Sequence, residues 1–153
     1  MSEAQTDLPY METLNPEQRE AVEHSDSPLL ILAGAGSGKT RVITTKIAYL
    51  IAQKKIAPQS ILAVTFTKKA ANEMRERAIA LDERSRFAEI RTFHSFGAWF
   101  LRRYAAEANL APSFTVYDDD DAATLVMKAL PSLRRQQAEL AAHKISLAKD
   151  YCL

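Results

Sequence analysis

The chain has 153 residues, about the length of one domain. Hydrophobic residues make up 47% and charged residues 25%, with only 4 glycines and 6 prolines, which excludes collagen-like and low-complexity chains and makes a globular protein the default. The 20 basic and 19 acidic residues leave a net charge of +1, so any contact with nucleic acid must come from a local surface. The single cysteine, Cys152, excludes a disulfide framework and a cysteine-based zinc site.

The sequence carries no signal for a membrane or for export. No window approaches the ~18 uninterrupted apolar residues of a transmembrane helix. The N-terminus, Met1–Gln5, has neither the basic region nor the apolar run of a signal peptide. A lone cysteine fits a reducing compartment. We therefore expect a cytoplasmic protein with no membrane partner.

The N-terminal part predicts an arm, a helix and a strand. Residues 1–13 are polar and aperiodic, which predicts a loose arm. A helix follows, because Asn15 is a suitable N-cap, Pro16 suits the first helical position and Gln18 completes a capping box. The apolar run 28–33 then predicts a buried parallel strand.

The alternation continues through the middle of the chain. After a glycine-rich turn, the next helix is expected to place one apolar face on the core, formed by Ile43, Ile47, Leu50 and Ile51. Residues 61–64 predict a second buried strand, Thr67 is the expected N-cap of a helix from 68 to about 81, and 88–92 predict a third strand. This order predicts an α/β fold, a parallel sheet with helices on both faces.

Beyond residue 94 the pattern is helical only. The expected helix 94–108 has an apolar side, read as packing, formed by Phe96, Trp99, Phe100 and Tyr104. The acidic run 118–121 favours the start of a helix that ends before Pro131, and residues 134–153 also read as a helix. The sequence thus predicts the start of a helical subdomain.

The most informative motif follows the first predicted strand. It is a phosphate-binding loop with alanine at its first glycine position, formed by Ala33, Gly34, Ala35, Gly36, Ser37, Gly38, Lys39 and Thr40. Small residues let backbone N–H groups converge on phosphate oxygens at a helix N-terminus. Lys39 can reach the β- and γ-phosphates, and the Thr40 hydroxyl can ligate Mg²⁺. The loop predicts a site for ATP with Mg²⁺.

A phosphate-binding loop identifies a nucleotide site and not a reaction, since hydrolysis also needs a second acidic group on Mg²⁺. The best candidate is Asp118, although an acidic helix start explains that residue better. Two other functions therefore stay open. One is a small P-loop kinase that uses Asp118, and the other is a non-catalytic nucleotide-binding module.

Several segments together resemble the N-terminal part of superfamily 1 DNA helicases of the UvrD/Rep/PcrA type. The segments that carry the likeness are Leu14–Val22, Ala33–Thr40, Thr65–Met74, Arg91–Phe96 and, more weakly, Ile145–Asp150. Helicases of this type commonly have alanine at the first position of the phosphate-binding loop, so Ala33 agrees with the likeness. The first four motifs, in this order and spacing, are highly specific.

The resemblance implies a RecA-like motor domain. It makes residues 14–93 the first part of motor domain 1A and 94–153 a partial helical subdomain 1B. It also implies an ATP-dependent 3′-to-5′ helicase that acts on single-stranded DNA or 3′-tailed duplex DNA. The family's Walker B motif, second motor domain and arginine finger are not among these residues. We therefore expect a fragment that binds nucleotide but does not unwind DNA.

The resemblance also assigns roles to single residues. It implies that Gln18 reads the adenine edge, that Arg41 packs on the adenine face and that Arg75 approaches the nucleotide. A solvated surface arginine is the alternative for Arg41 and for Arg75. The implied DNA contacts lie at two strand ends and comprise Thr65, Phe66, Thr67, Lys68, Thr92, Phe93 and His94. An aromatic ring, hydroxyls and a lysine in one loop suit base stacking and phosphate binding, although Phe66 without this likeness would read as a core residue.

Overall fold

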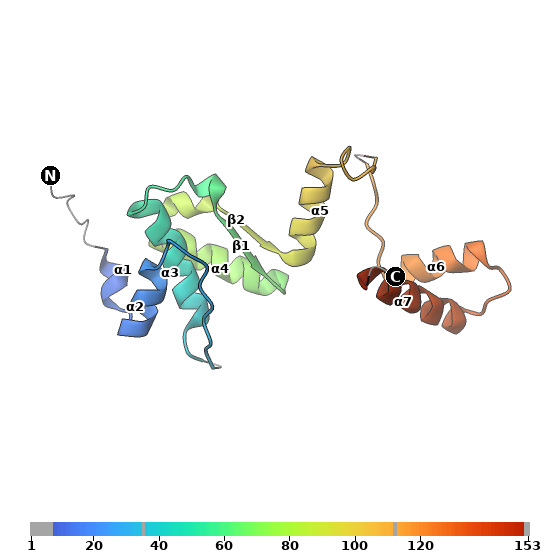
Figure 1. Cartoon of the computed structure of the whole chain (residues 1–153), viewed down its shortest axis with the longest axis horizontal. Coiled ribbons are helices and arrows are strands. Elements are labelled where there is room, and N and C mark those ends of the chain that lie inside the picture. The colour runs from blue at the N-terminus through green and yellow to red at the C-terminus, as the bar shows by residue number, and fades with distance from the viewer. Residues whose placement is uncertain (1–7, 35, 112, 152–153) are drawn as a thin grey trace. The chain divides into compact units, whose positions relative to one another are not determined.

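The computed structural model describes residues 8–34, 36–111 and 113–151 and divides into two compact units, Met1–Trp99 and Phe100–Leu153. The first unit holds most of the secondary structure (Figure 1): α1 (Pro9–Glu12), α2 (Pro16–Glu23), α3 (Lys39–Ala52), the 3₁₀ turn η1 (Pro58–Ser60), β1 (Leu62–Thr65), α4 (Lys68–Leu81), the 3₁₀ turn η2 (Glu83–Phe87) and β2 (Glu89–Thr92). Helix α5 (Phe93–Arg103) crosses the boundary, and the second unit contains α6 (Asp119–Ala129) and α7 (Arg135–Asp150).

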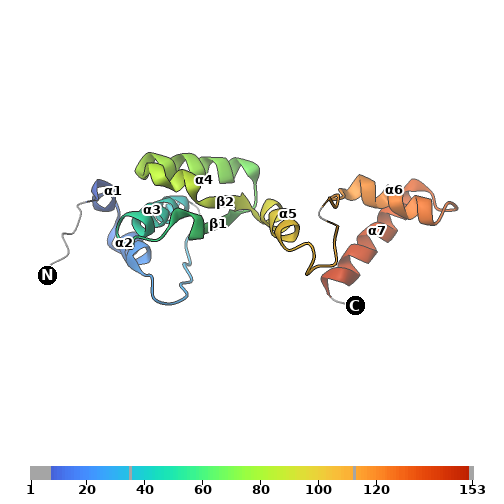
Figure 2. The same cartoon turned by 90° about the horizontal axis from the view of Figure 1, so that it is seen from above.

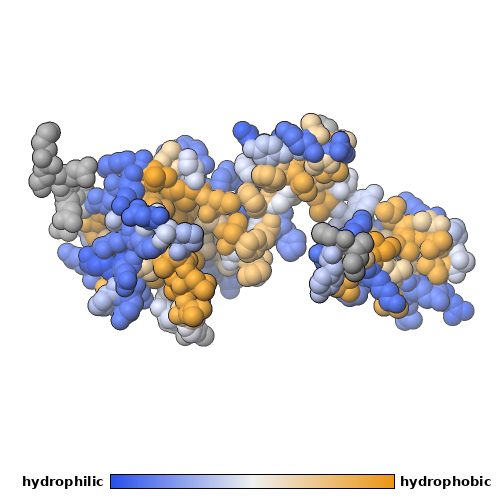
Figure 3. Space-filling view, viewed as in Figure 1, coloured by the Kyte–Doolittle hydropathy of each residue, from blue (hydrophilic) through white to orange (hydrophobic). Residues whose placement is uncertain are grey.

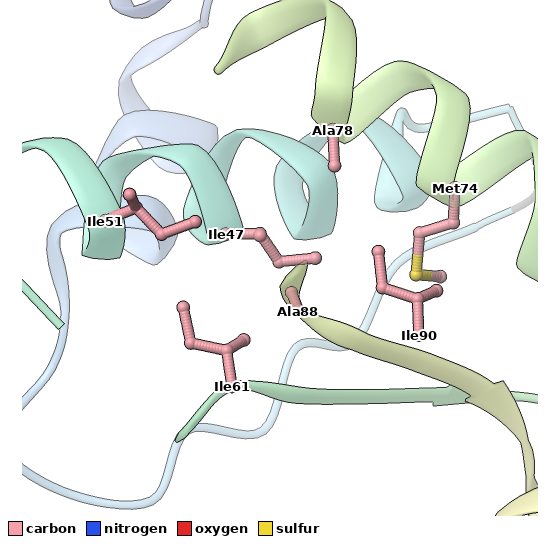
Figure 4. Packing of buried hydrophobic residues seen from close by; sticks show 7 residues of the cluster. All are labelled: Ile47, Ile51, Ile61, Met74, Ala78, Ala88 and Ile90. Atoms are coloured by element: carbon pink, nitrogen blue, oxygen red, sulfur yellow. The ribbon is translucent and has the colours of Figure 1, made fainter. Parts of the chain in front are cut away.

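The core of the first unit lies between two helices and a parallel pair of strands. β1 and β2 pair in parallel, with Leu62 opposite Glu89 and Thr65 opposite Thr92. Helices α3 and α4 lie on one side of these strands, as Figure 4 shows, and their apolar side chains meet those of the strand segments. The cluster comprises Ile47, Ile51, Ile61, Met74, Ala78, Ala88 and Ile90. Its burial holds the strand ends in place relative to α3, which carries the phosphate-binding loop at its N-terminus.

Most of the predicted local structure is confirmed. The Asn15 side chain accepts from the Gln18 N–H and the Gln18 side chain accepts from the Asn15 N–H, so the predicted capping box forms. Thr67 caps α4, which spans the predicted range, and β1 and β2 fall on the predicted second and third strands. These features depend on neighbours within a few residues, which is why the sequence specifies them.

The predicted strand at 28–33 is wrong. This segment has no regular secondary structure and pairs with neither β1 nor β2, the two strands among the described residues. Its side chains are exposed, Leu30 at 82% and Leu32 at 88%. In the space-filling view the segment between α2 and α3 is an apolar projection (Figure 3). An apolar run gives a strand only where a neighbouring strand receives its N–H and C=O groups. The expected sheet is therefore a parallel pair within the described residues.

Three smaller expectations also need correction. Ile43 is 40% exposed, and Val42 is buried in its place against α2. The expected arm 1–13 includes the short helix α1, while residues 1–7 lie outside the described residues. The helix expected to reach residue 108 ends at Arg103, and Phe100 in its last turns is exposed. For α3 and α5 the sequence pattern predicted a helix but not its buried face or its end, and for the arm it missed a short helix.

The second unit contains a helical hairpin of α6 and α7 (Figure 1). Ala123 and Ala138 are fully buried, and the small side chains allow the two helices to approach closely. Arg135 pairs with Asp120 of α6 and Glu139 of α7. Across the described parts of both units, no helix has the length and apolar character that crossing a bilayer requires.

Candidate functional site

The phosphate-binding loop leads directly into α3. Gly38, the N-cap of α3, has φ +86°, a left-handed conformation that favours glycine. The Lys39 ammonium donates to the carbonyl oxygens of Ala33 at 3.0 Å and of Gly34 at 2.6 Å. The Ser37 hydroxyl donates to the same Gly34 oxygen at 2.8 Å. Ala35, expected in this loop, lies outside the described residues. The Lys39 side chain thus folds back onto the carbonyls of its own loop, at the N-terminus of α3.

The loop borders a hollow of about 390 Å³. Its lining comes from α2 and its N-cap, the apolar segment before the loop, the loop itself and α3, and comprises Asn15, Glu17, Gln18, Ala21, Ile31, Leu32, Ala33, Gly34, Ser37, Lys39 and Val42. Thr40 is half-buried in the first turn of α3. A cation, a helix N-terminus and apolar walls next to one another suit a phosphorylated ligand with an apolar part. The residues present therefore fit a nucleotide, with the Thr40 hydroxyl as the group available to its metal ion.

Gln18 joins α2 to this loop. Its side-chain amide donates to the Ser37 carbonyl at 3.1 Å while its oxygen accepts from the Asn15 N–H at 3.2 Å. The contact is so close that a Cβ built on Gly38 would lie 2.8 Å from Gln18 Nε2. The amide still has one N–H and one oxygen lone pair free for a ligand. The two roles expected of Gln18, the helix cap and the ligand contact, are therefore compatible.

The close contact between Gln18 and Gly38 predicts the effect of Gly38→Ala. The added methyl group must displace Gln18, and the left-handed backbone at Gly38 disfavours any side chain. We expect a loss of about 1–3 kcal/mol in the free energy of unfolding. Thermal denaturation would measure it, with Gly34→Ala as the matched control, because a Cβ at Gly34 meets nothing within 4 Å. Equal midpoints for the two variants would contradict the prediction.

Sequence reasoning missed Lys46. Its ammonium donates to the backbone carbonyls of Ala21 at 3.0 Å, Val22 at 3.3 Å and His24, all at the C-terminal end of α2. Burial lowers the pKa of Lys46. The available signal was its position four residues after Val42, on the face of α3 that packs on α2.

The two arginines expected at the nucleotide lie apart from this hollow. Arg41 is exposed and lines a second hollow of about 340 Å³ with Tyr10, Thr44 and Arg77. The Tyr10 hydroxyl is buried without a partner among the described residues, and burial, with a smaller effect of the Asp82 charge, raises its pKa. Arg75 donates to the Ile90 carbonyl and to Asn72. The structure thus brings Gln18 and Lys39 together and places Arg41 and Arg75 elsewhere in the same unit.

The residues expected to contact DNA gather at one edge of the strand pair. Because Thr65 lies opposite Thr92, the segments that follow β1 and β2 begin side by side. Phe66 is 83% exposed, and its ring centroid lies 5.2 Å from that of Phe93, which is half exposed. His94 and Lys68 are also exposed. Because Phe66 is exposed, it is not a core residue of the first unit.

Two hydroxyls at this edge have structural partners. The Thr67 hydroxyl accepts from the Ala70 N–H at the start of α4. Thr92 is buried, and its hydroxyl bonds with the Ser95 hydroxyl and backbone N–H at the start of α5. Among the residues expected to contact DNA, the exposed side chains that do not cap a helix are therefore those of Phe66, Lys68, Phe93 and His94, and the exposed Thr67 is occupied as a cap.

The acidic candidate Asp118 is a helix cap. Its carboxylate accepts from the Asp121 N–H at 2.8 Å, and the Asp121 carboxylate accepts from the Asp118 N–H. This capping box occupies Asp118 at the start of α6, in the second unit. Nowhere among the described residues do three histidine, cysteine or acidic side chains form a group that could hold a metal ion.

Comparison with known proteins identifies the family. The sequence profile of the UvrD/REP helicase N-terminal domain matches residues 14–152, nearly the whole chain. The chain belongs to this family. Its match covers the capping box, the phosphate-binding loop and both strand ends, so the resemblance stated from the motifs is confirmed.

Individual relatives agree with this assignment. The chain is 46% identical over 146 residues to the ATP-dependent DNA helicase UvrD1 of Mycobacterium tuberculosis (strain CDC 1551 / Oshkosh), with 92% of this chain and 19% of the relative covered. It is 50% identical over 119 residues to a probable DNA helicase II homolog of Rickettsia conorii, covering 76% and 18%. It is 45% identical over 123 residues to the ATP-dependent DNA helicase PcrA of Staphylococcus epidermidis (strain ATCC 12228 / FDA PCI 1200), covering 80% and 17%. The chain thus spans about a fifth of the length of these curated relatives.

Proposed function

We propose that this chain is the ATP-binding part of a RecA-like motor domain from an ATP-dependent 3′-to-5′ DNA helicase. The observation that carries the proposal is the convergence of Lys39, the N-terminus of α3 and the Gln18 amide on one hollow. That arrangement suits a triphosphate at one end and a base edge at the other. The relatives' names, which describe ATP-dependent DNA helicases, support it.

Each residue has a distinct task in this proposal. Lys39 exchanges its two carbonyl partners for β- and γ-phosphate oxygens, and the N–H groups at the start of α3 add donors to the same anion. The Thr40 hydroxyl ligates the accompanying Mg²⁺. Gln18 uses its remaining N–H and lone pair on adenine, which presents an acceptor and a donor side by side. Arg75 joins this site only if its side chain leaves the Ile90 carbonyl and Asn72, and Arg41 joins it only if its side chain turns from the second hollow that it lines.

The strand-end edge is proposed as the single-stranded DNA contact. Exposed rings of Phe66 and Phe93 offer faces on which bases stack, and Lys68 supplies a cation for the backbone. His94 follows Phe93 directly and is exposed at the same edge. The substrate in this proposal is single-stranded DNA or a duplex with a 3′ single-stranded tail.

The chain by itself is proposed to bind nucleotide without turning it over or unwinding DNA. Among the described residues that line the hollow, Glu17 alone carries a carboxylate, and it lies in the first turn of α2. Calorimetric titration with Mg-ATP should show binding, and a phosphate-release assay with single-stranded DNA should show no turnover. DNA-stimulated hydrolysis by the purified chain would contradict the second part. No heat of binding at any concentration would contradict the first.

A pair of variants tests the DNA surface. Phe66→Ala and His94→Ala should weaken single-stranded DNA binding and leave ATP affinity unchanged. Loss of a stacking ring costs about 1–3 kcal/mol per base. Fluorescence anisotropy of a labelled oligonucleotide at low salt is the measurement, because phosphate contacts are least screened there. Phe87→Ala is the matched control, since Phe87 is half exposed on η2. The assignment fails if the control and the test variants bind DNA equally.

A further inference from the structure

Helix α2 is held at both of its ends, by the phosphate-binding loop at one end and by α3 at the other. At the N-terminal end, Gln18 donates to the Ser37 carbonyl of the phosphate-binding loop. At the C-terminal end, Lys46 donates to the carbonyls of Ala21, Val22 and His24. Both attachments are to backbone atoms, so they fix where α2 lies along α3.

The apolar contacts of α2 do not fix that position equally well. Ala21 and Val22 of α2 lie in one apolar cluster with Val42 of α3, against which Tyr49 of α3 also packs. Apolar packing is non-directional, whereas a hydrogen bond has a narrow range of distance and angle. The directional restraints therefore come from Gln18 and Lys46. Lys46 meets the last carbonyls of α2, which have no partner within their own helix.

We propose that Lys46 is a positioning residue for Gln18: by holding the C-terminal end of α2, it keeps the Gln18 amide against the phosphate-binding loop. A helix transmits the restraint because it is stiff along its axis. From Gln18 to Val22 the rise is about 6 Å, roughly one turn. A displacement at the carbonyls that Lys46 holds therefore moves Gln18 by a similar amount.

The cost of the arrangement supports a specific role. Burying an ammonium group is unfavourable unless its N–H groups are satisfied, and three carbonyls satisfy all three of them. Methionine would fill the same space without that cost, so packing between α2 and α3 alone does not require a lysine. The inference rests on the proposed recognition of adenine by Gln18 and adds Lys46 as the residue that positions Gln18.

The test compares Lys46→Met, Lys46→Arg and Lys54→Met in the full chain. Lys54→Met removes an exposed lysine just after the end of the same helix. One readout needs no ligand: the nuclear Overhauser contact between the Gln18 side-chain amide and the Gly38 α-protons. Lys46→Met should abolish this contact, and the other two variants should retain it. The amide signals of Ala21 and Val22 verify that α2 stays folded, and Lys46→Gln is the milder substitute if it does not.

The second readout is the ratio of affinities for ATP and GTP. Lys46→Met should lower this ratio about five- to ten-fold, the worth of one neutral hydrogen bond, and Lys46→Arg should restore it. An intact Gln18–Gly38 contact in Lys46→Met, or an unchanged ratio once that contact is lost, would overturn the inference. A wild-type chain that does not prefer ATP would instead refute the proposed reading of adenine, and the Overhauser contact would still decide whether Lys46 positions Gln18.

Discussion

Replacement of Lys39 by alanine is expected to raise the dissociation constant for Mg-ATP roughly ten- to hundred-fold. A charge-assisted hydrogen bond contributes about 1.5–3 kcal/mol, and 1.4 kcal/mol is ten-fold in affinity. Lys39 is exposed and reaches only carbonyls of its own loop, so its removal leaves the core of the first unit intact. Isothermal titration calorimetry measures the change.

The matched control is Lys54→Ala, which removes one positive charge from an exposed position beyond the other end of α3. Its affinity should equal that of the unmodified chain. If both variants lose affinity equally, the effect is one of total charge and Lys39 has no special place in the site. Equal thermal midpoints for all three proteins would verify that binding, and not folding, has changed.

The largest expected effect on stability is that of Ile90→Ala. Ile90 is 1% exposed, and its side chain lies among those of α3 and α4 (Figure 4). Truncation of a fully buried isoleucine removes apolar contacts and leaves a cavity, which costs about 2–5 kcal/mol. Urea denaturation followed by the fluorescence of Trp99, the single tryptophan, reports on the first unit.

Ile43→Ala is the informative control, because the sequence pattern assigned Ile43 to the core whereas the structure leaves it 40% exposed. Its cost should stay well below that of Ile90→Ala. Comparable losses for the two variants would favour the sequence pattern over the structure at this position.

The contrast between these two isoleucines shows what the sequence could and could not predict. Helical periodicity predicts that Ile43, Ile47 and Ile51 lie on about the same face of α3. It does not reveal that α3 packs on α4 and the strand segments through Ile47 and Ile51, and on α2 through Val42. The apolar stripe is therefore rotated away from Ile43.

Local features were predictable for a related reason. The capping box of Asn15 and Gln18 and the cap at Thr67 involve residues three positions apart, so their partners are visible in the sequence. The strand expected at 28–33 depends on a neighbouring strand, and the role of Lys46 depends on carbonyls 22–25 positions away. Neither partner can be identified from the segment itself. The same reasoning applies to the site, where the loop motif identified Lys39 but not the residue that holds Gln18.

The register of the two strands also affects the local electrostatics. Because Thr65 lies opposite Thr92, helices α4 and α5 both begin at the same edge, within a few residues of the paired strand ends (Figure 2). Each helix N-terminus acts as about half a positive elementary charge, so the two together contribute roughly one. This positive charge is local and leaves the formal net charge of the chain at +1, because each helix carries the opposite partial charge at its C-terminus. A nearly neutral protein thus has a positive potential at this edge, to which Lys68 and Lys69 add.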